Sequence, residues 1–405
     1  MSFRIALSGL NAASAHLDVT ANNIANVNTA GFKGSRAAFA DVYATSNNDV
    51  TKTTPGAGVR LNTITQEFSQ GNIDFTDNNL DLAISGEGFF TMKGTSGVTY
   101  TRAGSFSVDR DGFVVNNNLE RLQVFPPSGD GNFSTGSLSD LQLQVSENAP
   151  KSTERAQIGV NLPANAPTPA ATPFDPSLPT SYNHATSMTV YDSLGTQHTA
   201  TLYFVKDAAA NTWNQQLYVD NNAVGGFNTV SFSNAGELQT PASGLITYPS
   251  YDPGTGAAAM DLSFDFTAST QYGKEFGVNN LQQDGFTTGR LTGIEVDNTG
   301  IVSARFTNGQ SKQLGKVAMA SFSNPNGLQQ QGDTSWAETF ASGSPRVGEA
   351  GSSNFGLLQS GALESSNVDL TSQLVEMITA QRNFQANTQM ISTADAVTQA
   401  IINIR

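Results

Sequence analysis

The chain has 405 residues, a formal net charge of −14 and no cysteine. The length allows about two to four domains. The acidic balance argues against a nucleic-acid-binding surface, and the lack of cysteine excludes disulfides and thiolate metal sites. No stretch is apolar for long enough to cross a membrane or to form a signal-peptide core. We therefore expect no membrane insertion, and export, if it occurs, without a cleaved Sec signal.

Uncharged polar residues dominate the composition. Only 13% of the residues are charged, about half of the roughly 25% that is usual in soluble proteins. Such a surface suits close packing against copies of the same chain, because desolvating an amide costs less than desolvating a charge. Ordinary secreted β-proteins share this composition, so it does not decide between these classes.

Both ends of the chain carry a heptad pattern, in which apolar residues recur seven positions apart. This pattern is typical of helices that pack lengthwise on another helix. Asp369 directly follows the expected N-cap of the second helix, which is predicted to run almost to Arg405. The residues expected to form the helix contacts are Phe3, Leu10, Leu17, Ile24, Val27, Leu370, Leu374, Met377, Phe384, Ile391 and Ile401.

Helices of this length are only marginally stable alone in water. Two arrangements would stabilise them. The helices could pack on each other as a hairpin within one chain, or they could pack against neighbouring subunits of a polymer. We expect the polymer, with the hairpin as the alternative.

The first helix is expected to end in the stretch TANNIANVNTAGFKG, whose amides are Asn22, Asn23, Asn26 and Asn28. Asparagine tolerates the left-handed conformation at a helix end, and Gly31 is expected to supply the terminating turn. Uncharged amides can also donate hydrogen bonds to a neighbouring subunit without adding charge. We expect both roles for this run.

The residues between the two helices indicate strands. Short alternating runs with turn residues lie in 71–150 and in 186–276, and TGIEVDNTGIVSARFTNGQ and KVAMASF add three more strands. The proline-rich segment 163–179 cannot lie inside a sheet, so it marks a boundary or an extended crossing segment.

The predicted fold is mainly β with α-helical termini, and an outer β-domain is inserted into an inner one. The predicted boundaries are 1–30 and 368–405 for the terminal helical domain, 31–70 and 359–367 for the connector, 71–150 and 285–358 for the inner β-domain, and 151–284 for the outer β-domain.

Three stretches resemble the rod and hook axial-protein family of the bacterial flagellum. SGLNAASAHLDVTANNIANVNTAGFKGSR is similar to its opening motif, LDLAISGEGFF with YTRAGSF to its middle motif, and SNVDLTSQLVEMITAQRNFQANTQMIST to its closing helix. The three stretches occur in the family's order. Rod members are shorter and lack a large inserted domain, so the length and the insertion resemble those of the hook subunit.

The resemblance implies a structural subunit that assembles with itself into a flexible, curved hollow tube. This tube would act as a universal joint that passes torque from the basal-body rod to the filament, with the terminal helices lining its channel. The implied partners are other copies of the chain, the distal rod, the hook-associated junction protein, the hook cap and the flagellar export apparatus, and the implied location is the hook at the cell exterior. The alternative within the family is a distal-rod or other hook–basal-body protein.

No catalytic pattern occurs in the sequence. His16, His184 and His198 lie far apart without ligand spacing. Asp109 and Asp111 resemble a calcium loop only faintly, and we expect a hairpin turn there. The GEG and GTG stretches lack the strand–helix context of a dinucleotide loop. We therefore expect no catalytic, metal or cofactor site.

A secreted carbohydrate-binding or hydrolytic β-protein is the alternative of another class. It would require convergent aromatic residues and a pair of carboxylates around a cleft. It would also leave both heptad segments without a role.

Overall fold

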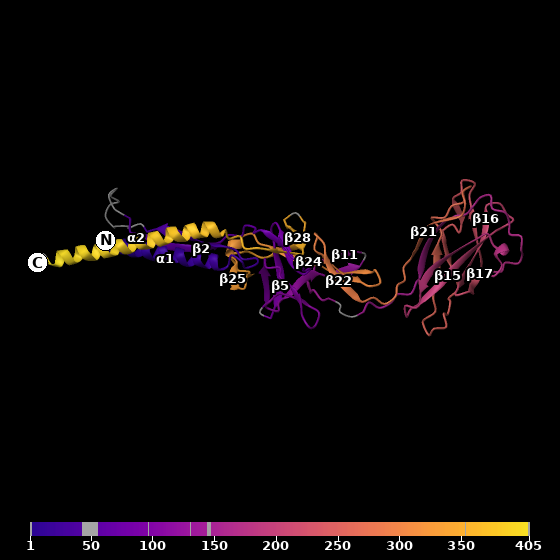
Figure 1. Ribbon diagram of the computed structural model, residues 1–405, viewed down its shortest axis with the longest axis horizontal. Coiled ribbons are helices and arrows are strands. Elements are labelled where there is room, and N and C mark those ends of the chain that lie inside the picture. The colour runs from indigo at the N-terminus through magenta and orange to yellow at the C-terminus, as the bar shows by residue number, and fades with distance from the viewer. Residues whose placement is uncertain are drawn as a thin grey trace. The chain divides into compact units, whose positions relative to one another are not determined.

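The structure is a computed structural model that describes residues 2–42, 56–95, 97–129, 131–143, 147–352 and 354–403. These residues form two compact units (Figure 1). Unit 1 comprises Met1–Val145, Gly293–Arg305 and Ser311–Arg405, and unit 2 comprises Ser146–Thr292 and Phe306–Gln310. The fold is mainly β with helices at both ends of the chain, as predicted.

The two helices belong to unit 1 and run antiparallel, side by side (Figure 1). α1 spans Ser2–Ala25 and α2 spans Leu370–Asn403. Near the start of α1, a Cβ on Gly9 would lie 2.5 Å from the side-chain oxygen of Asn387, so the two helices approach closely here. Near the end of α1, Asn23 Nδ2 donates to Gln373 Oε1 at 3.1 Å. The structure therefore contains the hairpin within one chain, and packing of the helices against neighbouring subunits stays a prediction.

The helix ends differ in two details from the prediction. Asp369 is itself the N-cap of α2, because its carboxylate accepts a hydrogen bond from Ser372 N at 2.7 Å. α1 ends at Ala25, so Gly31 does not terminate it. Gly31 has φ 68°, and a Cβ there would lie 2.4 Å from Ala103 N, so this glycine lets two backbone segments cross.

A hairpin of β1 (Ser35–Asp41) and β2 (Val59–Gln66) follows α1. The strands pair antiparallel from Ser35↔Gln66 to Asp41↔Val59, with an irregularity between Ala38 and Phe39. Residues 43–55 of the predicted connector lie outside the described residues.

The main sheet of unit 1 has the strand order β22-β23-β24-β9-β5-β6-β26-β25. β24 pairs with β9 and with β5, so the sheet joins strands from before and after unit 2. Its strands are β5 (Phe89–Gly94), β6 (Gly97–Thr101), β9 (Arg121–Phe125), β22 (Leu291–Val296), β23 (Ile301–Phe306), β24 (Ser311–Ser321), β25 (Gln329–Gly332) and β26 (Ser335–Ala337), with β7 (Ser107–Val108), β8 (Val114–Val115), β12 (Ser139–Asp140) and β27 (Arg346–Glu349) attached to them.

Two short pairs connect this sheet to the helices. β4 (Leu82–Ser85) pairs with β28 (Leu357–Ser360), and β3 (Ile73–Phe75) pairs with β29 (Ala362–Glu364). A small hairpin of β10 (Pro127–Gly129) and β11 (Asn132–Phe133) and a 3-10 turn, η2 (Pro325–Gly327), complete the elements of unit 1. The described part of unit 1 has two core clusters, and the larger one includes Ile84, Phe90, Met92, Leu122, Val302 and Val317.

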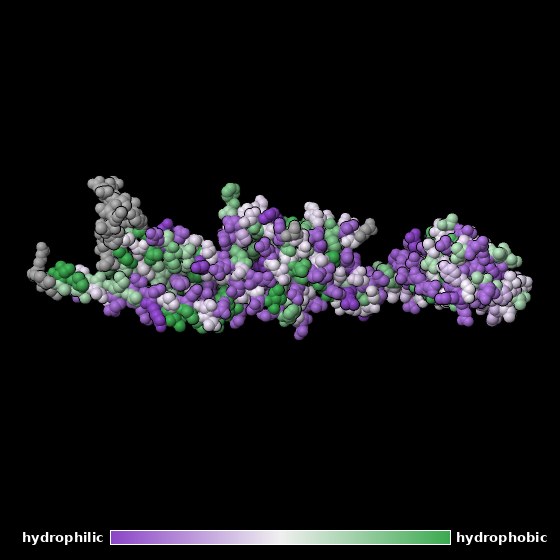
Figure 2. Space-filling model, turned by 90° about the horizontal axis from the view of Figure 1, so that it is seen from above, coloured by the Kyte–Doolittle hydropathy of each residue, from purple (hydrophilic) through white to green (hydrophobic). Residues whose placement is uncertain are grey.

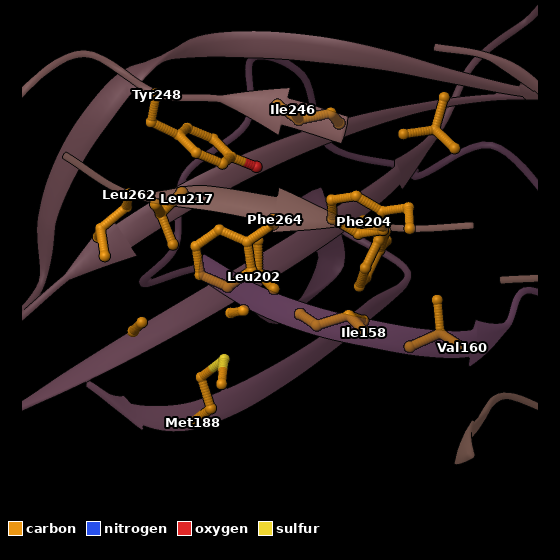
Figure 3. Packing of buried hydrophobic residues seen from close by; sticks show 14 of the residues in the cluster. Ile158, Val160, Met188, Leu202, Phe204, Leu217, Ile246, Tyr248, Leu262 and Phe264 are labelled. Carbon is orange, nitrogen blue, oxygen red and sulfur yellow. The ribbon is translucent and has the colours of Figure 1, made fainter. Parts of the chain in front are cut away.

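Unit 2 is built from two sheets that share one core (Figure 3). The first sheet has the order β14-β15-β16-β17-β18 and the second β19-β20-β13-β21, in which β13 and β20 are parallel. The strands are β13 (Arg155–Asn161), β14 (His184–Tyr191), β15 (Gln197–Lys206), β16 (Thr212–Val219), β17 (Asn222–Phe232), β18 (Leu238–Thr240), β19 (Leu245–Thr247), β20 (Ser263–Asp265) and β21 (Gly277–Gln283).

The proline-rich segment crosses the first sheet of unit 2 on the side away from this core. It carries Phe174 and leads to the 3-10 turn η1 (Pro179–Ser181). The ring of Phe174 contacts those of Tyr203 on β15, Tyr218 on β16 and Phe227 on β17, with centroids 5.4–6.0 Å apart. The sequence allowed a domain boundary or an extended crossing segment for residues 163–179, and the structure has a crossing segment.

Candidate functional site

The helix pair packs through a narrow row of mostly small side chains. On α1 the fully buried residues are Ala6, Ala13, Val19, Thr20 and Asn23, and on α2 Ala380 is buried. The half-buried positions of α2 that continue this row are Gln373, Met377, Phe384, Asn387, Ile391 and Ala394. They recur at alternating intervals of three and four residues, which is the spacing of one helix face. The predicted residues Met377, Phe384 and Ile391 therefore lie on the face toward α1.

Outside this row, and where α2 extends past α1, both helices leave large apolar side chains exposed. On α2, exposure ranges from 44% at Leu370 and Leu374 to 67% at Ile402. The other exposed large apolar residues of α2 are Val375, Ile378, Met390, Val397 and Ile401, and α1 adds Phe3 and Leu7. We call this set the apolar helix face. Figure 1 shows α2 extending beyond the start of α1, and apolar residues gather at that end of unit 1 in Figure 2.

The predicted helix contacts thus fall into two groups. Leu10, Leu17, Ile24 and Val27 are half-buried, as are the three residues of α2 that face α1. Phe3, Leu370, Leu374 and Ile401 belong to the apolar helix face. A groove of about 920 Å³ runs between Phe3 and the α2 residues Met390, Ala394 and Val397. Contact with another subunit stays a prediction for all of these residues.

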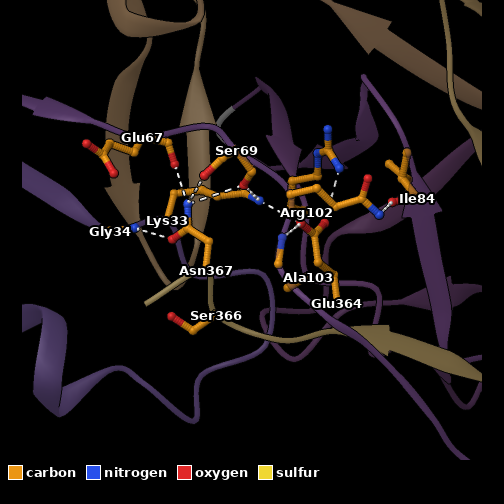
Figure 4. A network of polar contacts seen from close by, with 12 residues as sticks. Lys33, Gly34, Glu67, Ser69, Ile84, Arg102, Ala103, Glu364, Ser366 and Asn367 are labelled. Atoms are coloured by element: carbon orange, nitrogen blue, oxygen red, sulfur yellow. Dashed lines mark hydrogen bonds and ion pairs between the residues drawn. The ribbon is translucent and has the colours of Figure 1, made fainter. Parts of the chain in front are cut away.

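A buried ion cluster lies where the helices meet the β-strands of unit 1 (Figure 4). Lys33 Nζ donates to Glu364 Oε1 at 2.6 Å and to the Ser69 carbonyl at 2.8 Å. Arg102 Nη1 donates to Glu364 Oε2 at 3.1 Å, and its Nη2 donates to the Gly86 carbonyl at 2.8 Å. The side chains of Lys33 and Glu364 have no exposed surface, and that of Arg102 is 5% exposed. One carboxylate therefore joins the loop after α1, the strand before Arg102 and the segment before α2.

The charges of this cluster add little net stability, and their main effect is to hold the joined segments in fixed positions. Burial lowers the pKa of Lys33 and of Arg102, while the charge and hydrogen bonds of Glu364 act in the opposite direction on both groups. Two cations share one anion, and removing such charges from water costs several kcal/mol per ion, of the order of what their attraction returns. The strict geometry of the cluster fixes how three segments meet.

Two asparagines, Asn23 and Asn367, extend the ion cluster toward the helices. We call the cluster of Lys33, Arg102 and Glu364 together with these asparagines the polar junction. Asn367 Oδ1 accepts from Gly34 N at 2.8 Å, and its Nδ2 donates to the Glu67 carbonyl at 2.6 Å (Figure 4). Asn23 Nδ2 donates to the Ser35 carbonyl, and its Oδ1 accepts from Ser35 N, both at 2.8 Å. The junction therefore ties both helices to the start of the β1–β2 hairpin.

The four predicted helix-end amides have different roles in the structure. Asn23 is 3% exposed and clamps α1 within its own chain, which corrects the expectation that this amide faces a neighbouring subunit. Asn26 Nδ2 donates to the Asn22 carbonyl at 2.9 Å and so belongs to the helix end. The side chains of Asn22 and Asn28 are exposed. Contact with another subunit remains a prediction for these two.

Sequence reasoning did not single out Lys33, Arg102 or Glu364. Lys33 and Arg102 each lie inside one of the stretches that carry the family resemblance, GFKGSR and YTRAGSF, and Glu364 stands shortly before SNVDL. A lysine and an arginine inside these motifs, next to or near glycines, are the sequence feature that could have indicated the cluster.

The structure gives partners to His198 and to the acidic turn at Asp109. In unit 2, the ring of His198 lies between Asp192 and Asp220, with Nδ1 2.5 Å from Asp220 Oδ2 and Nε2 3.3 Å from Asp192 Oδ2. Asp109 Oδ1 accepts from the amides of Asp111 and Phe113, so this stretch is the predicted hairpin turn. Among the described residues, no group of three or more histidine and acidic side chains is placed to hold a metal ion. None of the described helices is long and apolar enough to span a membrane.

Four family models match the sequence. Residues 3–33 match the flagella basal body rod protein, and residues 83–167 match the flagellar hook protein FlgE/F/G D1 domain. Residues 161–286 match the flagellar basal body protein FlaE D2 domain, and residues 359–404 match the C-terminal part of the flagellar basal body rod FlgEFG proteins. The first and last matches contain α1 and α2.

Three relatives are similar over nearly the whole chain. The flagellar hook protein FlgE of Salmonella typhimurium is 38% identical over 416 residues, and the one of Escherichia coli is 37% identical over 422 residues. Both alignments cover 100% of this chain and 100% of the relative. The flagellar hook protein FlgE of Borreliella burgdorferi is 32% identical and covers 98% of each chain.

The fold is also similar to that of a solved structure. The crystal structure of the Helicobacter pylori flagellar hook protein FlgE2 matches with a TM-score of 0.55 and 14% sequence identity. The match covers 72% of this chain and 100% of that structure. At this identity the likeness concerns the fold alone.

Proposed function

The chain belongs to the family of flagellar hook proteins, and we propose that its terminal helices hold it in a hollow tube built from many copies of itself. It is a structural subunit of the bacterial flagellar hook, and its partner is first of all another copy of the same chain. The full-length similarity to hook proteins disfavours the alternative of a distal-rod protein.

The apolar helix face carries this proposal. An isolated subunit leaves side chains such as Leu374, Ile378 and Ile402 44–67% exposed along α2. Burying apolar surface contributes about 25 cal/mol per Å², so a helix that exposes such a row gains stability when another helix covers it. The inner row holds α1 and α2 together, and the exposed apolar residues are left for neighbouring subunits.

The polar junction gives this packing a mechanical role. A joint must resist twist and yield to bending. We propose that packed helices supply the resistance to twist and that the cluster around Glu364 passes the load from the helices to the β-strands of unit 1. Wet, weakly charged contacts between the outer parts of subunits exchange protein–protein for protein–water hydrogen bonds at small net cost, so they can slide as the tube bends.

Further partners follow from the family and complete the proposal. A hook subunit would meet the distal rod at one end of the tube and the hook-associated junction protein at the other, and it would add beneath the hook cap. It would reach the cell exterior through the flagellar export apparatus, without a cleaved Sec signal. A load-bearing tube needs no catalytic site, and we propose no enzymatic activity.

We propose that the inserted outer domain tunes the joint and does not build it. Deleting about 151–284 is expected to leave tubes that are straighter or mechanically altered. A folded deletion protein that no longer polymerises would contradict this role.

Electron microscopy of the purified chain, polymerised in vitro, tests the proposed function. We expect curved hollow tubes. Straight tubes would favour a rod protein, and a chain that stays monomeric under all polymerising conditions would contradict the proposal.

A further inference from the structure

We propose that Phe340 is a contact residue that inserts into a second copy of this chain, an inference that rests on the proposed polymer. Phe340 lies in the loop between β26 and β27 of unit 1. Its relative exposure is 106%, so the ring is as accessible as in an extended peptide. Phenylalanine is among the residue types most often buried, and full exposure of the ring gives its own subunit no packing energy.

The turn that presents this ring is rigid. Thr339 Oγ1 accepts from Ala341 N at 3.1 Å and from Ser342 N at 3.2 Å. Ser342 Oγ accepts from Thr339 N at 2.9 Å and donates to the Thr339 carbonyl at 2.8 Å. Ser342 itself has no exposed surface. Residues on both sides of Phe340 are therefore fixed by hydrogen bonds, while the ring between them is free.

The turn is also anchored to the neighbouring loop that contains η2. Asn324 Nδ2 donates to the Ala341 carbonyl at 3.0 Å. A Cβ on Gly327 would lie 2.5 Å from Ala341 C and Ser342 N, so the two backbones are in direct contact. A mobile loop that exposes a phenylalanine loses conformational entropy when the ring is buried, and this anchored turn has lost that entropy already.

The shape of the feature points to a second copy as the partner. A single protruding ring buries most of its surface when it enters a concave site, and such a site lies at a different place on the partner than the ring. Contacts between different patches of identical chains are heterologous, and they generate helical polymers when the rotation does not close. A hook subunit is surrounded by other copies, so a fixed convex knob on unit 1 recurs at every subunit of the tube.

A comparison of three chains tests this inference: the unaltered protein, Phe340→Ser and the control Val98→Ser. Val98 is also exposed in unit 1, at 45%, but lies in the β5–β6 hairpin. We expect all three monomers to melt at the same temperature. The concentration of monomer left beside the polymer should rise about fivefold to tenfold for Phe340→Ser, the size of a typical interface anchor. It should change less than twofold for Val98→Ser.

A labelling experiment locates the contact without removing the ring. The chain has no cysteine, so Ala341→Cys carries a single thiol beside Phe340. We expect this thiol to react with a maleimide at least tenfold more slowly in the polymer than in the monomer. Equal labelling rates, or an unchanged residual monomer concentration for Phe340→Ser, would overturn the inference. Failure of the unaltered chain to polymerise would instead contradict the proposed function.

Discussion

The terminal helices and unit 2 differ in how far they bury their apolar side chains. In unit 2, residues such as Leu202, Phe204 and Phe264 from both sheets are at most 1% exposed (Figure 3). In α2, by contrast, Ala380 is buried and the large apolar residues from Leu370 to Ile402 are half-buried or exposed. Unit 2 buries its large apolar side chains within one chain, whereas the helices leave many of theirs exposed.

This difference separates two kinds of stability. The free energy of unfolding of unit 2 is expected to be independent of polymerisation, because its core is complete in one chain. The helix pair is expected to gain most of its stability from neighbouring subunits, because most helical stability in proteins comes from packing of an apolar face. The predictions that follow alter one region at a time, from the largest expected change in the monomer to the smallest.

The core of unit 2 should be sensitive to a cavity. Phe264→Ala removes a ring that has no exposed surface, and such truncations lower the free energy of unfolding by about 3–5 kcal/mol. Calorimetry of the monomer should show a lower transition temperature for unit 2. A transition that stays in place would contradict the claim that this core holds unit 2 together.

The polar junction should be sensitive to loss of its carboxylate. Glu364→Gln leaves Lys33 and Arg102 buried without a counter-charge and should lower the stability of unit 1 by about 3 kcal/mol. Glu349→Gln is the matched control, because Glu349 pairs with Lys316 at a partly exposed site, with side-chain exposures of 32% and 13%. It should cost about 1 kcal/mol or less. Equal effects in denaturant titrations would refute a special role for the cluster.

His198 makes the stability of unit 2 depend on pH. Burial opposes its charged form, but hydrogen bonds with Asp220 and Asp192 raise its pKa above the ordinary value. Burial likewise opposes ionisation of Asp192, yet hydrogen bonds from Thr196, Thr255, His198 and Leu194 lower its pKa to about 2.

The two pKa shifts make the stability of unit 2 fall on both the alkaline and the acidic side of its pH range. The contribution of His198 is complete below its unfolded pKa of about 6.5 and is lost as the pH rises through the raised folded value. The contribution of Asp192 is present above about pH 4 and is lost as the pH falls toward its lowered value. His198→Gln should destabilise unit 2 by about 1–2 kcal/mol near pH 6. It should also weaken the fall of the melting temperature of unit 2 with rising pH. If this fall is unchanged in the variant, His198 is not its cause.

The sequence predicts the fold class, because the two helices and the strands depend on local periodicity. Met377, Phe384 and Ile391 recur at heptad spacing and share the face toward α1. The same periodicity cannot tell which face a subunit covers itself, because apolar residues such as Leu374 and Ile378 occur on the other side of α2 as well. Periodicity alone therefore does not distinguish a hairpin within one chain from packing between subunits.

The polar junction could not be predicted, because its partners are far apart in the chain. Lys33 and Glu364 are 331 positions apart, and Arg102 and Glu364 are 262 apart. Asn23 stood among the predicted amides, but its partner Gln373 is 350 positions away. Such pairs leave no periodic pattern, so only the folded chain identifies them.

Leu374→Asp tests the central claim most directly, because Leu374 is 44% exposed on the apolar helix face. The control Asn383→Asp adds the same charge at an exposed position nine residues further along α2, half a turn around the helix from Leu374. Both substitutions should change the stability of the monomer by about 0.5 kcal/mol or less, as at other exposed sites. The measurement is the amount of polymer that each variant forms, by sedimentation. We predict that Leu374→Asp forms no tubes while Asn383→Asp forms them normally. Normal tubes from Leu374→Asp would contradict the use of this face between subunits.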